Sequence, residues 1–246
     1  MNRVAVVLPA AGRSTRFGGE VRKPFVLLDG KPVWHHALDL FARRPDVVKV
    51  LLVLSPDALD DFRARYGVML GFTYENVELV AGGAERFESV ANALARVPAD
   101  TDLVAVHDAV RCLTPAAVID AVFAAAATHG GAVAAVPVAD TLKCVAPGTA
   151  TVVGTVPRGD LWQAQTPQAF RRDWLLDAYA RRAEFAGPIT DDAQLMEAAG
   201  RPVVVVPGSP ANFKITTPAD LALAEALLRP APPPAAPPRR PFDDLD

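Results

Sequence analysis

The chain has 246 residues, of which 51% are hydrophobic, and its 25 Lys and Arg residues against 28 Asp and Glu give a net charge of −3. This length and apolar content suffice for one sizeable α/β domain, and the charge argues against nucleic acid or an acidic membrane as a partner. Two cysteines without metal-binding spacing fit a reducing compartment. Because the sequence shows neither a signal peptide nor a membrane-length apolar run, we expect a cytoplasmic protein.

A predicted buried strand followed by a cationic loop begins the chain. Residues 4–8 form a continuous apolar run rich in β-branched side chains, which is typical of a strand covered on both faces. Ala10, Ala11 and Gly12 then let the backbone come close to a ligand, and the loop from Arg13 to Lys23 carries four cations against one acid. This combination predicts a phosphate-binding loop at the carboxyl end of a strand, with a basic surface loop as the alternative.

The loop differs from two widespread phosphate-binding motifs. No Gly-Lys-Ser/Thr follows at the required spacing, and Gly12 is followed by Arg13 and Ser14 where spaced glycines would be needed. The P-loop and the dinucleotide-binding fingerprint are therefore both excluded.

Strands and helices are predicted to alternate along the rest of the first half. The expected elements are a helix over 32–44, a strand over 47–54, a helix from 55 to about 66, a strand over 77–80, a helix after Gly83, a strand over 103–107, a helix over 115–128 closed by Gly130 and a strand over 132–138. This alternation indicates an α/β fold with a Rossmann-like, mostly parallel sheet and helices on both faces.

The turn after the strand over 77–80 is a second candidate site. Gly82 and Gly83 allow a tight turn, and Arg86 and Ser89 fall in the first helical turn, where unpaired backbone N–H groups attract anions. An arginine at a helix start opposes the helix dipole, so a bound ligand explains Arg86 better than helix stability does. A solvated arginine after a glycine turn is the alternative.

Asp108 directly follows the predicted strand over 103–107. A carboxylate at the carboxyl end of a central parallel strand is placed to hold a divalent cation. The alternative is that Asp108 caps a helix, but Thr114 and Pro115 already provide the beginning of the next helix. We therefore favour the metal role.

Residues 140–157 leave the α/β alternation. Two β-rich segments flank the Pro147-Gly148 turn, which predicts a hairpin, and their weak alternation indicates that one face packs on another subunit. Arg158 lies just past this hairpin. The segment over 161–170 then mixes amides, hydroxyls and aromatic rings, which suits either the wall of a ligand site or a plain strand-to-helix connection.

The C-terminal third is predicted to contain a helix over 173–185, a helix that begins at Thr190 as N-cap, a strand over 203–206 and a short strand that carries Lys214. Thr217, Pro218 and Asp220 mark the beginning of the last helix. Prolines are dense from residue 230 onward, so we divide the chain into a domain over 1–229 and a disordered tail over 230–246.

Six blocks follow one another in the sequence: PAAGRSTRF, the lysine at 23, GGAERFESV, HDAVR, the segment of DTLK, Arg158 and LWQAQTPQAF, and ITDD with NFKIT. This ordered set resembles the 2-C-methyl-D-erythritol 4-phosphate cytidylyltransferase family, within the sugar-nucleotidyltransferase superfamily. The resemblance covers residues from about 3 to 228. Each block alone is moderately specific, and the ordered set is strongly so.

The resemblance implies Mg²⁺-dependent transfer of CMP from CTP to methylerythritol phosphate, in isoprenoid precursor biosynthesis, by a homodimer with a dimerisation arm at about 140–157. It implies that Arg16 and Lys23 stabilise the transition state and that Arg158 and Lys214 position the acceptor. The residues implied on the nucleotide side are Ala10, Ala11, Gly12, Gly83, Arg86, Ser89 and Ala109, with Asp108 near Mg²⁺. Those implied on the acceptor side are Arg111, Thr141, Thr166 and Thr190.

The sequence departs from the family pattern at four places. Around the lysine implied to be catalytic, the family often has Pro-Lys-Gln, and this chain has Arg22-Lys23-Pro24. Arg22 is therefore the alternative to Lys23 for this role. The three other changes are Ala84 for an acidic residue, Cys112 for proline and Ala211 for aspartate. Two alternative functions remain. A ribitol 5-phosphate cytidylyltransferase shares the layout, whereas a non-catalytic nucleotide-binding regulator would leave the four cations Arg16, Lys23, Arg158 and Lys214 unexplained.

Overall fold

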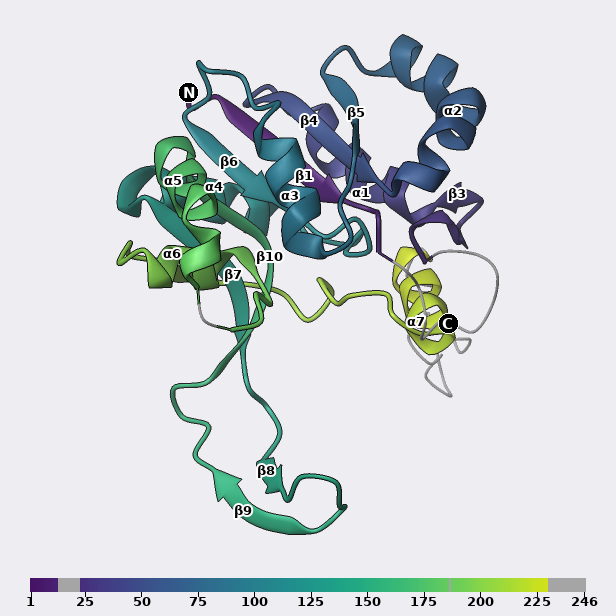
Figure 1. Ribbon diagram of the computed structural model, residues 1–246. Coiled ribbons are helices and arrows are strands. Elements are labelled where there is room, and N and C mark those ends of the chain that lie inside the picture. Colours follow the sequence, from purple (N-terminus) through teal and green to yellow (C-terminus); the bar gives the residue numbers. More distant parts are fainter. Residues whose placement is uncertain (13–22, 186, 230–246) are drawn as a thin grey trace, which may run out of the picture.

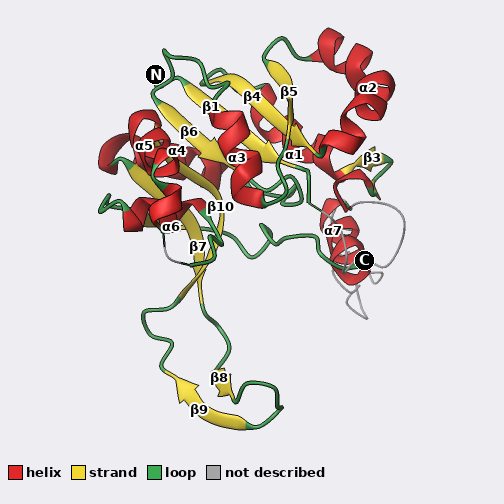
Figure 2. Cartoon of the chain, in the orientation of Figure 1, coloured by secondary structure: helices red, strands yellow, loops and turns green. Residues whose placement is uncertain are grey.

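A seven-stranded sheet forms the centre of the computed structural model, which describes residues 1–12, 23–185 and 187–229 (Figures 1 and 2). Its strands are β1 (Val4–Pro9), β4 (Val47–Leu54), β5 (Val77–Ala81), β6 (Leu103–Val106), β7 (Gly131–Pro137), β10 (Trp162–Arg171) and β11 (Val204–Pro207). They lie in the order β11-β7-β10-β6-β1-β4-β5, and all run parallel except β10. The predicted α/β fold with a mostly parallel sheet is confirmed.

The alternating side chains of β1 explain why its apolar run is continuous. Val4, Val6 and Leu8 pack into the core on one face of the sheet, and Ala5 and Val7 pack into the core on the other. All five are at most 1% exposed. A central strand of a parallel sheet is covered by helices on both faces, so no position along it is left for a polar side chain.

Helices cover the two faces in two groups. The first group consists of α1 (Val33–Ala42), α2 (Leu59–Thr73) and α4 (Ala116–His129), and the second of α3 (Arg86–Leu94), α5 (Arg172–Ala180) and α6 (Asp192–Ala198). The last helix, α7 (Pro218–Leu228), packs in a smaller cluster against α1 and the short strand β2 (Leu27–Leu28), which pairs with β3 (Lys31–Pro32). Single 3₁₀ turns lie at Lys23–Phe25, Pro56–Ala58 and Arg182–Glu184.

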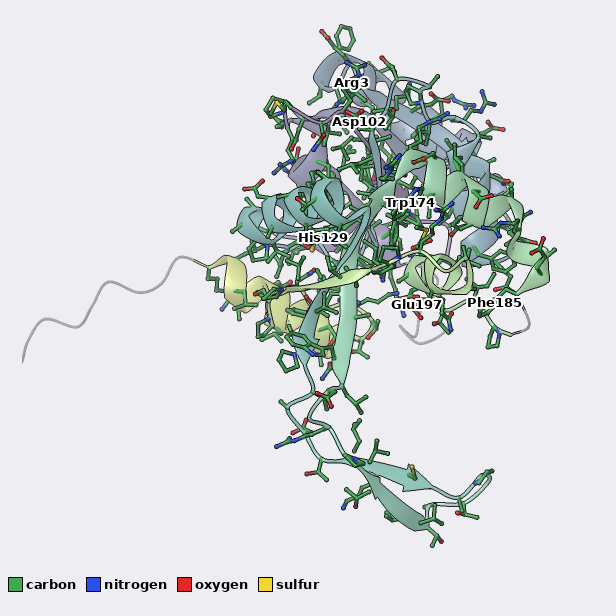
Figure 3. The ribbon with its side chains drawn as sticks, turned by 90° about the vertical axis from the view of Figure 1, so that its left-hand side faces the viewer. Arg3, Asp102, His129, Trp174, Phe185 and Glu197 are labelled. Atoms are coloured by element: carbon green, nitrogen blue, oxygen red, sulfur yellow. The ribbon has the colours of Figure 1, made fainter. Side chains whose placement is uncertain are left out.

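An arm leaves the body between β7 and β10. In it, β8 (Leu142–Val145) and β9 (Val152–Val156) pair antiparallel in a sheet of their own. Figures 1 and 3 show from two directions that this pair stands clear of the central sheet. Its apolar side chains Leu142, Val145, Val152 and Val153 are exposed.

The largest difference from the sequence-based expectation is β10. Residues 161–170 were expected to be a ligand wall or a connection, but nearly all of them lie in a strand between β6 and β7. Pro167 is unfavourable in a central strand, and buried glutamine amides are costly there unless they find hydrogen-bond partners. The strand accommodates them because its register shifts between Ala164 and Gln168, and because distant segments provide partners for the Gln165 and Gln168 amides.

Several predicted boundaries were also wrong. The helix expected to end near Tyr66 continues to Thr73, the helix expected to reach Phe185 ends at Ala180, and no strand forms around Lys214. A backbone hydrogen bond outside any strand helps to hold the segment of Lys214: Ile215 N donates to the Val110 carbonyl. The local sequence around Lys214, which predicted a short strand, therefore forms an irregular segment.

Two predicted caps were wrong and one is confirmed. Asp191, not Thr190, caps α6, because its carboxylate accepts from Gln194 N. The Thr114 hydroxyl does not cap α4, because it donates to Asn212 Oδ1 at 2.7 Å and also lies 3.0 Å from the Arg111 carbonyl. At α7 the capping box of Thr217 and Asp220 is present as predicted.

Gly130 ends α4 in the left-handed region, with a φ of 90°. A Cβ at this position would collide with the ring of Trp174, which Figure 3 labels near the end of α4 at His129. We expect Gly130→Ala to lower the free energy of unfolding by about 2–4 kcal/mol, from backbone strain and the displaced ring together. Equilibrium unfolding in urea measures this change.

Gly200 provides the matched control for Gly130. It also follows a helix with a positive φ, of 67°, but a Cβ there would meet nothing within 4 Å. Gly200→Ala is therefore expected to cost only about 1 kcal/mol, the backbone contribution. Equal losses for the two variants would show that Trp174 yields without cost.

Candidate active site

A pocket of about 840 Å³ opens at the carboxyl ends of β1, β4, β5 and β6. Because parallel strands end at the same edge of the sheet, the loops that follow them meet there. The lining comes from five regions of the chain: Pro9 to Gly12 with Lys23 and Pro24, Ser55 to Asp57, Gly82 to Arg86 with Ser89, Asp108 with Val110, and Lys214 with Thr216. The pocket thus unites the two candidate loops with the aspartate and the C-terminal lysine.

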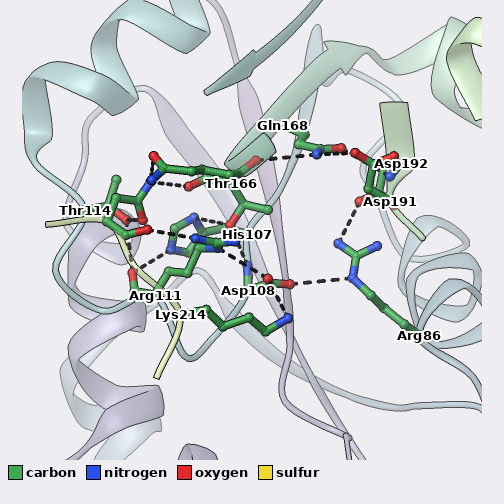
Figure 4. Close-up of polar contacts among 12 residues, drawn as sticks. Arg86, His107, Asp108, Arg111, Thr114, Thr166, Gln168, Asp191, Asp192 and Lys214 are labelled. Carbon is green, nitrogen blue, oxygen red and sulfur yellow. Dashed lines mark hydrogen bonds and ion pairs between the residues drawn. The ribbon is translucent and has the colours of Figure 1, made fainter. Parts of the chain in front are cut away.

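Asp108 lies at the centre of a cluster of cations (Figure 4). Its carboxylate is 3.0 Å from Lys214 Nζ, 3.5 Å from Arg86 Nε and 3.5 Å from Arg111 Nε. Burial opposes ionisation of this side chain, but the three charges outweigh it and hold the pKa of Asp108 well below its ordinary value. Asp108 is therefore an anion at neutral pH, and the pocket floor has an excess of positive charge.

A second carboxylate, buried behind the pocket, holds Arg86. The Asp192 side chain is 0% exposed, and its oxygens accept from Arg86 Nη2 at 2.8 Å and from the Tyr179 hydroxyl at 2.5 Å. Burial works against the charge of Arg86, but Asp192 and Asp108 raise its pKa above the ordinary value. A ligand is therefore not needed to explain an arginine at the start of α3, because the chain itself pairs it.

Buried groups tie Asp108 to the sheet. The Thr166 hydroxyl oxygen accepts from Asp108 N at 3.0 Å and lies 3.1 Å from His107 Nδ1, and His107 Nε2 lies 3.0 Å from the Arg111 carbonyl. Burial lowers the pKa of His107 to about 4, more than the hydrogen bond to the Arg111 carbonyl and the charge of Asp108 raise it. The ring is thus neutral at pH 7.

Asn212 fixes the segment that carries Lys214. This side chain is fully buried, and its amide donates to Gln165 Oε1 and to the Thr166 carbonyl while its oxygen accepts from the Thr114 hydroxyl. The Asn212 carbonyl accepts from Arg111 Nη1 at 2.8 Å. One asparagine therefore joins β10, the loop after β6 and the segment of Lys214.

The structure brings nine of the predicted site residues to the pocket: Ala10, Ala11, Gly12, Lys23, Gly83, Arg86, Ser89, Asp108 and Lys214. Ala109 and Thr166 are buried beside it, and Arg111 reaches Asp108 from the same loop. Thr141 and Arg158 are exposed at the base of the arm, and Thr190 is exposed before α6. Arg16 lies outside the described residues.

Five residues of the site were not predicted from the sequence: Ser55, Asp57, His107, Asp192 and Asn212. Ser55 and Asp57 follow β4 at its carboxyl end, a signal equivalent to the one that marked Asp108. For Asp192 the ITDD block pointed to the right segment, but its partner Arg86 lies 106 positions earlier. Local sequence does not show such a pair.

Small residues after a first buried strand, with cations gathered around one aspartate at the sheet edge, define the site of a nucleotidyltransferase. The sequence matches the family 2-C-methyl-D-erythritol 4-phosphate cytidylyltransferase over residues 4–230, and the chain belongs to this family.

Known relatives agree in sequence and in structure. The chain is 44% identical over 231 residues to the 2-C-methyl-D-erythritol 4-phosphate cytidylyltransferase of Pelotomaculum thermopropionicum, covering 93% of this chain and 95% of the relative. The 4-diphosphocytidyl-2C-methyl-D-erythritol synthase of Anaerococcus prevotii superposes with a TM-score of 0.79 at 28% identity, covering 92% and 96% of the two chains. The cytidylyltransferase of Thermus thermophilus gives 0.71 at 35% identity, covering 92% and 98%.

The length and apolar character of the helices decide whether one of them could cross a membrane. Among the residues that the structure describes, none of the helices has the length and apolar character needed to span a bilayer.

Proposed function

We propose that the pocket binds CTP and that the chain transfers CMP from it to 2-C-methyl-D-erythritol 4-phosphate, with release of pyrophosphate. The observation that carries this proposal is the pocket itself, in a member of this family: Lys23 lines it, and Arg86 and Lys214 pair there with Asp108 at the carboxyl edge of the sheet. Its volume of about 840 Å³ lies within the range typical of small-molecule sites.

The reaction is a substitution at the α-phosphorus of CTP. An oxygen of the acceptor's phosphate forms the new P–O bond, and the bond from the α-phosphorus to the bridging oxygen of the β-phosphate breaks, so that pyrophosphate leaves with the electron pair. The acceptor's phosphate is already ionised, so a strong general base is not needed. What the chain must supply is positive charge at fixed places, because two polyanions meet and charge spreads over the transferring group.

In this proposal Lys23 and Lys214, two lysines that line the pocket, supply that charge. Lys23 follows the small-residue loop, where backbone N–H groups and cations favour a triphosphate. Lys214 lies near the C-terminal end of the domain's sequence and forms an ion pair with Asp108. Arg16, which lies outside the described residues, is assigned to the same task as Lys23 on the family pattern.

We further propose that Asp108 holds Mg²⁺ together with the nucleotide. Among the described residues there is no group of three or more His, Cys, Asp or Glu that could hold a metal, so Asp108 would be the single carboxylate that the pocket floor offers to the ion. A single carboxylate fits Mg²⁺ when substrate phosphates and waters complete the octahedron. Bound there, the ion would neutralise charge on the triphosphate.

The identity of the acceptor can be tested directly against its alternative, ribitol 5-phosphate. Ribitol 5-phosphate carries the same phosphate on a similar polyol, so we propose an assay of CTP turnover with both acceptors in parallel. Higher kcat/KM for methylerythritol phosphate is expected. Faster turnover of ribitol 5-phosphate would reverse the choice of acceptor, and no turnover with any pair in folded protein would favour a regulator.

We also propose a homodimer in which the arm of one chain completes the site of the other. Thr141 and Arg158, at the base of the arm, do not line the pocket of their own chain, and the β8–β9 pair exposes Leu142, Val152 and other apolar side chains. A two-stranded ribbon is marginal by itself and needs a surface to pack on. A second copy of this chain would provide that surface.

Mixing two inactive variants tests the exchange of arms. Lys23→Ala and Arg158→Ala are each expected to be nearly inactive. If Arg158 acts in the partner's site, a mixed dimer has one site with both changes and one with neither, so random exchange of equal amounts restores about a quarter of the wild-type sites. Activity measured after exchange, with tagged subunits to confirm it, gives the answer. No recovery would show that Arg158 serves its own chain.

A further inference from the structure

The segment that carries Lys214 has no regular structure of its own. Between the end of β11 at Pro207 and the beginning of α7 at Pro218, the described chain forms turns and extended backbone without a strand or a helix. The lysine side chain is 44% exposed, and its ammonium lies 3.0 Å from Asp108 (Figure 4). A long side chain has many rotamers, so the place of this charge depends on the groups that fix the backbone around it.

Gln165, in the strand β10, provides such a group. It is only 6% exposed, and its side-chain amide bonds to both backbone groups of Ser209. Nε2 donates to the Ser209 carbonyl at 2.9 Å, and Oε1 accepts from Ser209 N at 3.3 Å. The same Oε1 accepts at 3.1 Å from Nδ2 of the fully buried Asn212. One glutamine of the sheet thus holds two residues of the segment that precede Lys214.

Backbone partners fix the orientation of both amides. A backbone carbonyl can only accept and a backbone N–H can only donate, so the two groups of Ser209 leave one orientation for the Gln165 amide. In the same way, the Thr166 carbonyl lies 2.8 Å from Asn212 Nδ2 and requires a nitrogen there. None of these groups ionises near neutral pH, so the arrangement does not depend on the charge of any side chain.

Gly208 shows how closely the segment lies against this amide. A Cβ on Gly208 would lie 2.4 Å from Gln165 Oε1, a distance at which the two atoms overlap. On the other side of Lys214, Ile215 N donates to the Val110 carbonyl at 3.0 Å. The lysine therefore extends from backbone that is held on both sides.

We propose that Gln165 is a positioning residue for Lys214. Its amide fixes the backbone at Ser209 and Asn212, and through it keeps the lysine ammonium beside Asp108. Gln165 does not line the pocket, so it acts through Lys214 and not on a substrate. The kinetic part of this proposal rests on the proposed function, in which Lys214 supplies charge, and the structural part does not.

Amide hydrogen exchange tests the structural part without any assay of activity. Gln165→Met keeps the length of the side chain but cannot bond to Ser209 or Asn212. Since the lost bonds are buried and local, we expect the N–H groups of Asn212 and Ile215 to exchange roughly tenfold faster, with those of α3 unchanged. Exchange of this segment at the wild-type rate would overturn the proposal.

Two further variants make the exchange experiment specific. Gly208→Ala would displace the same amide by its Cβ, so it should accelerate the same N–H groups, and it replaces Gln165→Met if that variant does not fold. Gly130→Ala is destabilised at the end of α4 and should not accelerate exchange over 208–216 selectively. Equal acceleration of this segment in Gly130→Ala would show that general loss of stability, not Gln165, controls it.

A double-mutant cycle tests the kinetic part. We expect Gln165→Met to lower kcat roughly 10- to 100-fold, because small displacements of a charged group at a reacting centre have effects of this size, and to leave the KM for CTP within about threefold. In the Lys214→Ala background, the same change should lower kcat by less than about twofold, because two residues that act as one unit are not additive.

Two kinetic results would contradict a role through Lys214. The same loss of kcat in the Lys214→Ala background as in the wild type would mean that Gln165 acts on another group. Wild-type kinetics in Gln165→Met would mean that Lys214 keeps its place without the amide. If the wild type itself turned over no acceptor, the proposed function would fail, while the exchange rates would still decide whether Gln165 holds the segment.

Discussion

Replacing Lys23 with alanine is expected to lower kcat about a hundredfold and to change the KM for CTP only slightly. Lys23 lines the pocket. In the proposed reaction, negative charge on the transferring phosphoryl group and on the leaving pyrophosphate increases there as the bond breaks. An interaction that strengthens in the transition state lowers kcat when it is lost, and one such charge is worth about 3 kcal/mol. Steady-state kinetics with varied CTP separates the two constants.

Two further variants make this prediction specific. Lys31→Ala removes a lysine that pairs with Asp39 and does not line the pocket, so its kinetics should match the wild type. Arg22→Ala tests the alignment of the motif, because Arg22 lies outside the described residues and is the fallback for the lysine. A large loss for Arg22→Ala without one for Lys23→Ala would assign the role to the neighbouring position.

Replacing Asp192 with asparagine is expected to lower the free energy of unfolding by about 3 kcal/mol. The carboxylate is fully buried, and its removal leaves the charge of Arg86, whose side chain is 27% exposed, with only the more distant Asp108. Breaking a buried pair on one side costs about 3–5 kcal/mol, and partial exposure of Arg86 argues for the lower end. Unfolding in urea measures the difference.

A surface pair serves as the control for Asp192. Asp60 lies 3.2 Å from Arg63 but is 94% exposed, so Asp60→Asn should change stability little, because water screens such pairs. Tyr179→Phe removes one hydrogen bond to Asp192 and should cost about 1 kcal/mol. If Asp192→Asn were as stable as Asp60→Asn, the buried pair would not contribute to the fold.

The parallel part of the fold could be predicted from the sequence because its signals are local. Residues 4–8 are a continuous apolar run and Val47–Leu54 is apolar except for Lys49, and both form strands inside the sheet at nearly the predicted bounds. The strand β10 could not be recognised in this way. Gln165 and Gln168 are stable in the sheet only because Ser209, Asp191 and Asn212, far away along the chain, bond to their amides.

The candidate site was predictable to the extent that strand ends reveal it. Ala10, Gly83 and Asp108 each follow a predicted strand, and the topology of a parallel sheet brings such positions to one edge. Two contacts between side chains could not be inferred in this way. The pairing of Arg86 with Asp192, and the bond of Thr166 to His107, depend on which strands become neighbours in space.

A crystal structure of the complex with CTP and Mg²⁺ tests most directly that this pocket is where the nucleotide reacts. We expect the triphosphate between Lys23 and Lys214, the metal ion on Asp108, and the cytidine against the turn of Gly83 and Ser89. A nucleotide bound outside this pocket, or one whose α-phosphate lies away from both lysines, would contradict the proposed site.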